Sequence, residues 1–194
     1  AGNETFGNIT FVDSGAVRLH SSASADGDLY INASTDAAVG GNLNVTATTG
    51  NITQGRAVTI TGTSSFTTSQ NNADIILNNA NAFTGTVALN TTGSSGNATV
   101  VDASGLNLAA STVGGNLIAT ATTGNMTDDG ALAITGTTTL TTSANDATIA
   151  LDTTTNAFTG AVTITTNDND GTAADVTIDG GTTALILAAS TIDG

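Results

Sequence analysis

The segment Val39-Gly40-Gly41-Asn42-Leu43 recurs 74 residues later as Val113-Gly114-Gly115-Asn116-Leu117. The next stretch of chain recurs at the same spacing, because residues 46–53 read TATTGNIT and residues 120–127 read TATTGNMT. Self-similarity over such a distance is the signature of a repeat array, in which neighbouring units stack on one another. The repeat therefore takes precedence over any local motif.

Two further pairs of segments complete the unit. Residues 81–85 (NAFTG) return as residues 156–160, and residues 106–113 (LNLAASTV) return as residues 185–192 (LILAASTI). The spacing between equivalent residues grows from 74 to 79, because loops absorb insertions while strands keep their length. We expect one continuous solenoid in four parts: residues 1–38 end a truncated repeat, 39–112 and 113–191 are complete repeats, and 192–194 begin another.

Apolar residues alternate with polar or small ones in short runs throughout both repeats, which predicts strands with one buried face. The chain has no Pro, and a strand paired on both sides excludes Pro because it lacks an N–H group. A sandwich or barrel has no need of a recurring unit, so the repeats favour an all-β solenoid. Twelve residues are expected to face inward: Leu43, Val58, Ile60, Ile75, Val87, Leu106, Leu117, Ile134, Ile149, Val162, Ile178 and Leu187.

We therefore predict a right-handed parallel β-helix (β-solenoid) built from imperfect 74–79-residue repeats. Each repeat would wind three or four coils of roughly 18–25 residues, stacking like on like. The asparagines recur in pairs (Asn42/Asn116, Asn51/Asn125 and Asn81/Asn156). They are expected at corners, where their side chains bond turn backbone and tolerate left-handed conformations.

Composition excludes several partners. The chain has 2 basic and 16 acidic residues and a formal charge of −14, so it cannot neutralise nucleic-acid phosphates. No apolar run approaches the roughly 20 residues of a membrane helix, so we expect no membrane insertion. Without Cys, the chain has neither disulfides nor thiolate metal sites.

The recurring VGGNL, TATTGNIT, AVTITG and NAFTG segments resemble the repeats of filamentous-haemagglutinin-like bacterial surface proteins. The resemblance covers nearly the whole chain, most clearly from Val39 onward. It implies a right-handed parallel β-helix, export to the cell surface, and a role as the shaft of a long adhesin.

Few residues are candidates for chemistry. Residues 167–171 (NDNDG), followed by Asp175, resemble half of a calcium loop, so Asp168, Asp170 and Asp175 are the candidate ligands of calcium, the only cofactor the sequence raises. The alternative is a solvated acidic corner, because the distal Glu of such a loop is missing. His20 is the only imidazole and lacks a nucleophile elbow, so we expect it to be solvated and the protein not to be an enzyme.

The expected function is a structural stalk or fibre segment of an extracellular bacterial surface protein. Its partners would be neighbouring repeats or identical subunits end to end, and host or surface glycans are a further option. The alternative is a subunit of a self-assembling extracellular filament. A carbohydrate-binding or carbohydrate-cleaving β-helix is the less favoured enzyme-like option. Outward Thr pairs (Thr59/Thr61 and Thr163/Thr165) also raise an ice-binding solenoid, although Ala133 breaks the ladder where Thr59 stands in the other repeat.

Overall fold

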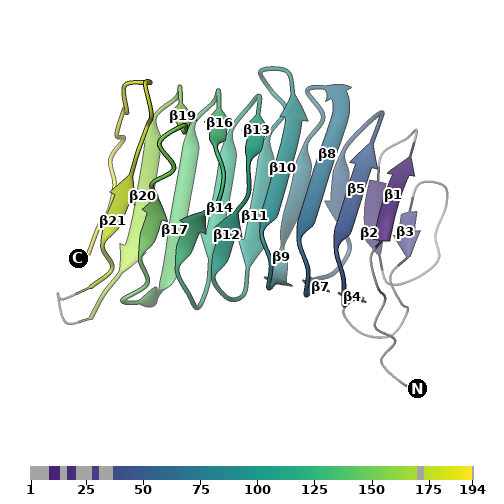
Figure 1. Cartoon of the computed structure of the whole chain (residues 1–194), viewed down its shortest axis with the longest axis horizontal. Helices are drawn as coiled ribbons and strands as arrows, with labels where there is room; N and C mark the ends of the chain where they lie inside the picture. The colour runs from purple at the N-terminus through teal and green to yellow at the C-terminus, as the bar shows by residue number, and fades with distance from the viewer. Residues whose placement is uncertain (1–8, 14–16, 21–27, 31–36, 170–172, 194) are drawn as a thin grey trace.

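The computed structural model describes residues 9–13, 17–20, 28–30, 37–169 and 173–193, which form a rod of stacked strands (Figure 1). The strands are β1 (Ile9–Asp13), β2 (Val17–His20), β3 (Asp28–Tyr30), β4 (Ala37–Val39), β5 (Leu43–Ala47), β6 (Ile52–Gln54), β7 (Val58–Ile60), β8 (Ser64–Asn71), β9 (Ile75–Phe83), β10 (Val87–Thr92), β11 (Ala98–Asp102), β12 (Leu106–Leu108), β13 (Ser111–Val113), β14 (Leu117–Ala121), β15 (Met126–Asp128), β16 (Leu132–Ile134), β17 (Thr138–Asn145), β18 (Ile149–Leu151), β19 (Ala157–Phe158), β20 (Val162–Asn167) and β21 (Val176–Ile178). Within these ranges no helix is long and apolar enough to cross a membrane.

The strands pair in parallel, coil upon coil, so that each coil presents three sides. Side 1 consists of β5, β8, β10, β13, β16 and β19 in stacking order. Side 2 consists of β6, the start of β9, β11, β14, β17 and β20. Side 3 contains β7 and the end of β9, and further along the rod β15, β18 and β21; β12 pairs with the start of β10 on one edge and with β15 on the other. About six coils are stacked in this way, and the predicted β-solenoid is confirmed.

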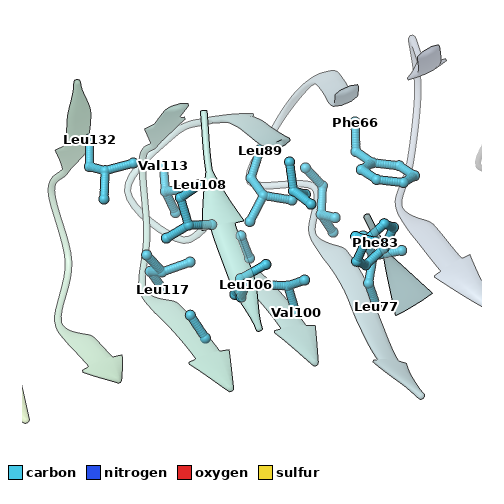
Figure 2. Packing of buried hydrophobic residues seen from close by; sticks show 14 of the residues in the cluster. Phe66, Leu77, Phe83, Leu89, Val100, Leu106, Leu108, Val113, Leu117 and Leu132 are labelled. Atoms are coloured by element: carbon cyan, nitrogen blue, oxygen red, sulfur yellow. The ribbon is translucent and has the colours of Figure 1, made fainter. Parts of the chain in front are cut away.

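The interior of the rod is filled by aliphatic side chains and a few rings (Figure 2). Phe66 and Phe83 meet edge to face, with ring centroids 6.1 Å apart. Ten of the twelve residues predicted to face inward are at most 1% exposed, and Ile178 is partly buried against them. The prediction is wrong for Leu187, which is 58% exposed. Leu187 pairs with Val162 on one edge only, and no described coil packs beyond it.

The repeat and the coil have different lengths, and this corrects the expectation that like stacks on like. One column on side 2 runs Ile52, Ile75, Ala98, Leu117, Thr138 and Val162, so a coil takes 19 to 24 residues. A 74-residue repeat therefore spans three coils plus one side. As a result, β5 lies on side 1, whereas its repeat equivalent β14 lies on side 2.

Gly62 and Gly136 allow the backbone of one coil to approach closely the VGGNL corner of the coil before it. A Cβ atom on Gly62 would lie 2.5 Å from the Gly41 carbonyl oxygen, and one on Gly136 would lie 2.5 Å from the Gly115 carbonyl oxygen. Contacts this short do not occur in real structures, so only Gly permits this stacking. Gly62 and Gly136 are repeat equivalents, so both repeats require Gly at this corner, and the two corners lie one side apart on the rod.

Candidate functional surfaces

The predicted corner asparagines lie at corners, and they join neighbouring coils. Asn42 Oδ1 accepts a hydrogen bond from the Thr63 N–H group at 2.9 Å, and Asn116 Oδ1 accepts one from Thr137 at 2.8 Å. Each side chain thus satisfies a backbone donor one coil further on, where the ladder is interrupted by the turn.

The expected left-handed conformations fall elsewhere. Asn72 (φ 63°) and Asp146 (φ 61°) are repeat equivalents, and both adopt positive φ, which short polar residues tolerate. Among the described residues, none of the six predicted corner asparagines has positive φ.

A second pair of corners is buried and polar. Asn81 Oδ1 accepts hydrogen bonds from Val58 N (2.9 Å) and Gln54 Nε2 (2.6 Å). Asn81 is fully buried, so these bonds replace water that the interior excludes.

The equivalent corner of the next repeat has the same design with a carboxyl group in place of the amide. Asn156 Oδ1 accepts a hydrogen bond from Leu132 N at 2.7 Å, and Asn156 Nδ2 donates to Asp128 Oδ2 at 2.7 Å. Asp128 is 8% exposed and also accepts from Asp152 N. This role for Asp128 could not be read from the sequence, where Gln54 occupies the equivalent position.

The LxLAAST segments end the two repeats, and each forms a joint in which the last residues of a repeat are stacked on the coil before. Ser111 Oγ accepts a hydrogen bond from Leu89 N at 3.0 Å and donates to the Ala109 carbonyl oxygen at 2.8 Å. The hydroxyl bridges a point where β10 pairs partly with β12 and partly with β13.

The second joint repeats these contacts. Ser190 Oγ accepts from Ile164 N at 3.0 Å and donates to the Ala188 carbonyl oxygen at 3.0 Å. Only the coverage differs between the two joints. Leu108 and Val113 are fully buried under β15 and β16, whereas their equivalents Leu187 and Ile192 are 58% and 44% exposed. Leu187, Ile192, Leu185 and Val176 line an open depression of about 400 Å³ at the C-terminal end of the described rod.

Asp102 is a buried carboxyl group near the first joint. Its Oδ2 accepts a hydrogen bond from Phe83 N at 3.2 Å, and its Oδ1 accepts from the Ser104 N–H and hydroxyl groups at 2.9 Å each. Burial removes the carboxylate from water and raises the pKa of Asp102 above its ordinary value, although these hydrogen bonds oppose the shift. Its three donors are two backbone N–H groups and one Ser hydroxyl, which hold the turn after β11 to the end of β9.

The candidate calcium ligands are only partly described. Asp168 is half-buried just after β20, Asp175 is exposed before β21, and Asp170 lies outside the described residues. Across the part of the chain that the structure covers, no three His, Cys, Asp or Glu side chains converge as metal ligands would. His20 lies in β2, and its side chain is outside the described set.

The outward Thr pairs of the two repeats lie on different sides of the rod. Thr59 is on side 3, where its partner in the next coil is Ala82, whereas Thr163 and Thr165 are on side 2. The two pairs therefore do not align on one face of the rod, as an ice-binding surface would require.

These stacked coils, corner amides and recurring joints define a β-solenoid repeat protein. The family model described as Repeats of unknown function (DUF5649) matches residues 6–90 and 95–165, and the chain belongs to this family. No curated protein and no solved structure matches the chain.

Proposed function

We propose that the protein is a structural shaft segment of an extracellular bacterial surface protein, with no catalysis of its own. The observation that carries the proposal is the recurring joint. Its contacts are the same in both copies, so each repeat ends in the same way, and β15 and β16 of the second repeat stack on the first copy. A chain built from such units lengthens by about 4.8 Å per coil without any change of design.

Three further features support this function. The strand faces of the described coils carry Thr, Asn, Ser and Ala rather than clustered charges, as at Thr46, Ser65 and Thr141. The buried polar groups are used to hold coils together. The resemblance to filamentous-haemagglutinin-like repeats adds the proposal that the shaft belongs to an adhesin and is exported to the cell surface.

A second function, the subunit of a self-assembling filament, is favoured by the exposed second joint. Leu187 and Ile192 present apolar area that the equivalent residues bury in the first joint. An identical subunit docking there end to end would remove that area from water.

Electron microscopy of the isolated chain separates the two functions. Monodisperse short rods at all concentrations support the shaft, and uniform unbranched fibres that lengthen with concentration support the filament subunit. Turnover of a polysaccharide that is abolished by changing one or two Asp residues would defeat both.

For the cellular location, antibodies against the rod should label intact bacteria, and labelling only after lysis would contradict the proposal.

A further inference from the structure

The outward face of side 2 carries a shallow groove in the middle of the rod. Thr99 of β11 is flanked by Ile76 of β9 in the preceding coil and by Ile118 of β14 in the following one. The short Thr side chain between two longer Ile side chains leaves a hollow of about 320 Å³, which we call the outer groove. Ile118 is 44% exposed, so its apolar surface is open to a ligand.

Polar side chains border the outer groove along the adjacent corner. Asp74 Oδ1 accepts a hydrogen bond from Asn97 N at 2.8 Å, and Asn97 Oδ1 accepts one from Asn116 N at 2.9 Å. Asn116 Oδ1 in turn accepts from Thr137 N at 2.8 Å. Because this ladder fixes the rotamers, the polar edge is preorganised and loses little entropy when it binds a ligand.

Several atoms of this edge keep their hydrogen-bonding capacity. Asp74 Oδ2, Asn116 Nδ2 and the Thr99 hydroxyl make no hydrogen bond to other described residues. The groove therefore offers an acceptor and a donor along one edge, and a hydroxyl that can do both between the two Ile side chains.

We infer that the outer groove binds a neutral oligosaccharide. A pyranose ring has apolar C–H faces, which suit Ile76 and Ile118, and an equatorial rim of hydroxyl groups, which suits Asp74, Asn116 and Thr99. The groove volume lies at the small end of ligand sites, which fits one or two sugar rings.

Charge selects among saccharides. The lining residues include one carboxylate, Asp74, and no Lys or Arg, so uronate, sialate and sulfate groups are repelled. No aromatic ring lines the groove, so the affinity rests on aliphatic contact and hydrogen bonds. The ligand is therefore a neutral glycan bound weakly at each site. This binding does not depend on the proposed shaft function.

The repeat supplies substitutions that the fold already accepts. The equivalents of Ile76 and Ile118 in the other repeat are Ala150 and Asn44, both on outward positions of well-formed strands. Ile76→Ala and Ile118→Asn therefore remove the walls of the groove and leave the coil intact. Ile186→Asn makes the same chemical change at an Ile that is 54% exposed and lies outside the groove, so it serves as the matched control.

The experiment is a titration of the full chain, labelled at Ile methyl groups, with cellotetraose, maltotetraose and chitotetraose as neutral probes. Tetragalacturonate is the acidic probe. We expect at least one neutral probe to shift the Ile76 and Ile118 methyl signals, with tetragalacturonate having no effect. Ile118→Asn and Ile76→Ala should each weaken the binding about tenfold, and Ile186→Asn should leave it unchanged.

Three results would overturn the inference. The first is the absence of methyl shifts with all neutral probes at tens of millimolar concentration. The second is an equal response to tetragalacturonate, which would mean that the groove does not discriminate charge. The third is a shift of the Ile76 and Ile118 signals with protein concentration alone, which would identify a second copy of the chain as the occupant. Intact rods in electron micrographs of the variants exclude misfolding as the cause of lost binding.

Discussion

The strands β5 and β14 are repeat equivalents with the same alternating burial, yet they lie on different sides of the rod. β5 is paired with β1 and β8 on side 1, and β14 is paired with β11 and β17 on side 2. A repeated sequence thus determines which residues point inward. The number of residues per coil decides which side of the rod those residues occupy.

The largest expected effect tests whether inward positions are equivalent despite the rotation. Ile60 and Ile134 are repeat equivalents on sides 3 and 1, each buried and each paired with a Phe of the next coil. Ile60→Asp and Ile134→Asp should each cost more than about 4 kcal/mol, because both bury an unpaired charge. Urea unfolding measures the cost, and Ala133→Asp at the exposed neighbouring position is the control. If one site tolerates Asp, the two repeats are not structurally equivalent.

The next prediction compares the two buried corners. Asn156→Ala should cost about 3–4 kcal/mol and Asn81→Ala about 2–3 kcal/mol, since the first leaves a buried carboxyl group short of a donor and the second leaves an amide. Denaturant midpoints at pH 7 test the order. Equal costs would mean that Asp128 gains no more from its Asn partner than Gln54 does.

A third prediction compares the two joints. Leu108→Ala should cost about 2–5 kcal/mol because it leaves a cavity under β15, whereas Leu187→Ala should change stability by less than about 0.5 kcal/mol. Thermal unfolding of dilute protein measures both. A large cost at Leu187 that depends on protein concentration would instead support the filament subunit, since another copy would then cover that joint.

A smaller effect, a gain in stability, is expected from a substitution at Thr138. The Thr138 hydroxyl is buried without a hydrogen-bond partner among the described residues, and so is the hydroxyl of its repeat equivalent Ser64. Thr138→Val keeps the shape and removes the unsatisfied group, so stability should rise by about 1 kcal/mol. The comparison is Ser64→Ala, which removes the equivalent hydroxyl without putting a methyl group in its place. A loss of stability in Thr138→Val would show that the hydroxyl has a partner after all.

The smallest effect concerns the pH dependence of stability. The pKa of Asp102 is raised above its ordinary value of 3.8 by burial. The folded state therefore holds this proton more tightly than the unfolded chain does. The resulting stabilisation is fully present below pH 3.8 and is lost as the pH rises through the folded-state pKa. Asp102→Asn should flatten the stability profile across that window in urea titrations, and an unchanged profile would exclude Asp102 as its source.

The class of fold and most of the core could be predicted from the amino-acid sequence alone. Alternation of period 2 decides which face of a strand is apolar, and ten of the twelve inward residues were predicted correctly because the solenoid buries one face of each strand. The corner asparagines could be predicted from their recurrence, since a turn that interrupts a ladder leaves backbone donors that a short amide can accept.

The way these elements combine depends on the tertiary structure. The rotation between repeats arises from coils of 19 to 24 residues that do not divide the 74-residue period, and the length of each coil is set by turns whose geometry no local pattern specifies. The outer groove depends on this rotation as well. Ile76 and Ile118 come from different repeats, and they flank Thr99 because three separate strands meet in register on side 2. Leu187 is exposed although its sequence matches the buried Leu108, because burial depends on what is stacked above a residue as much as on the residue itself.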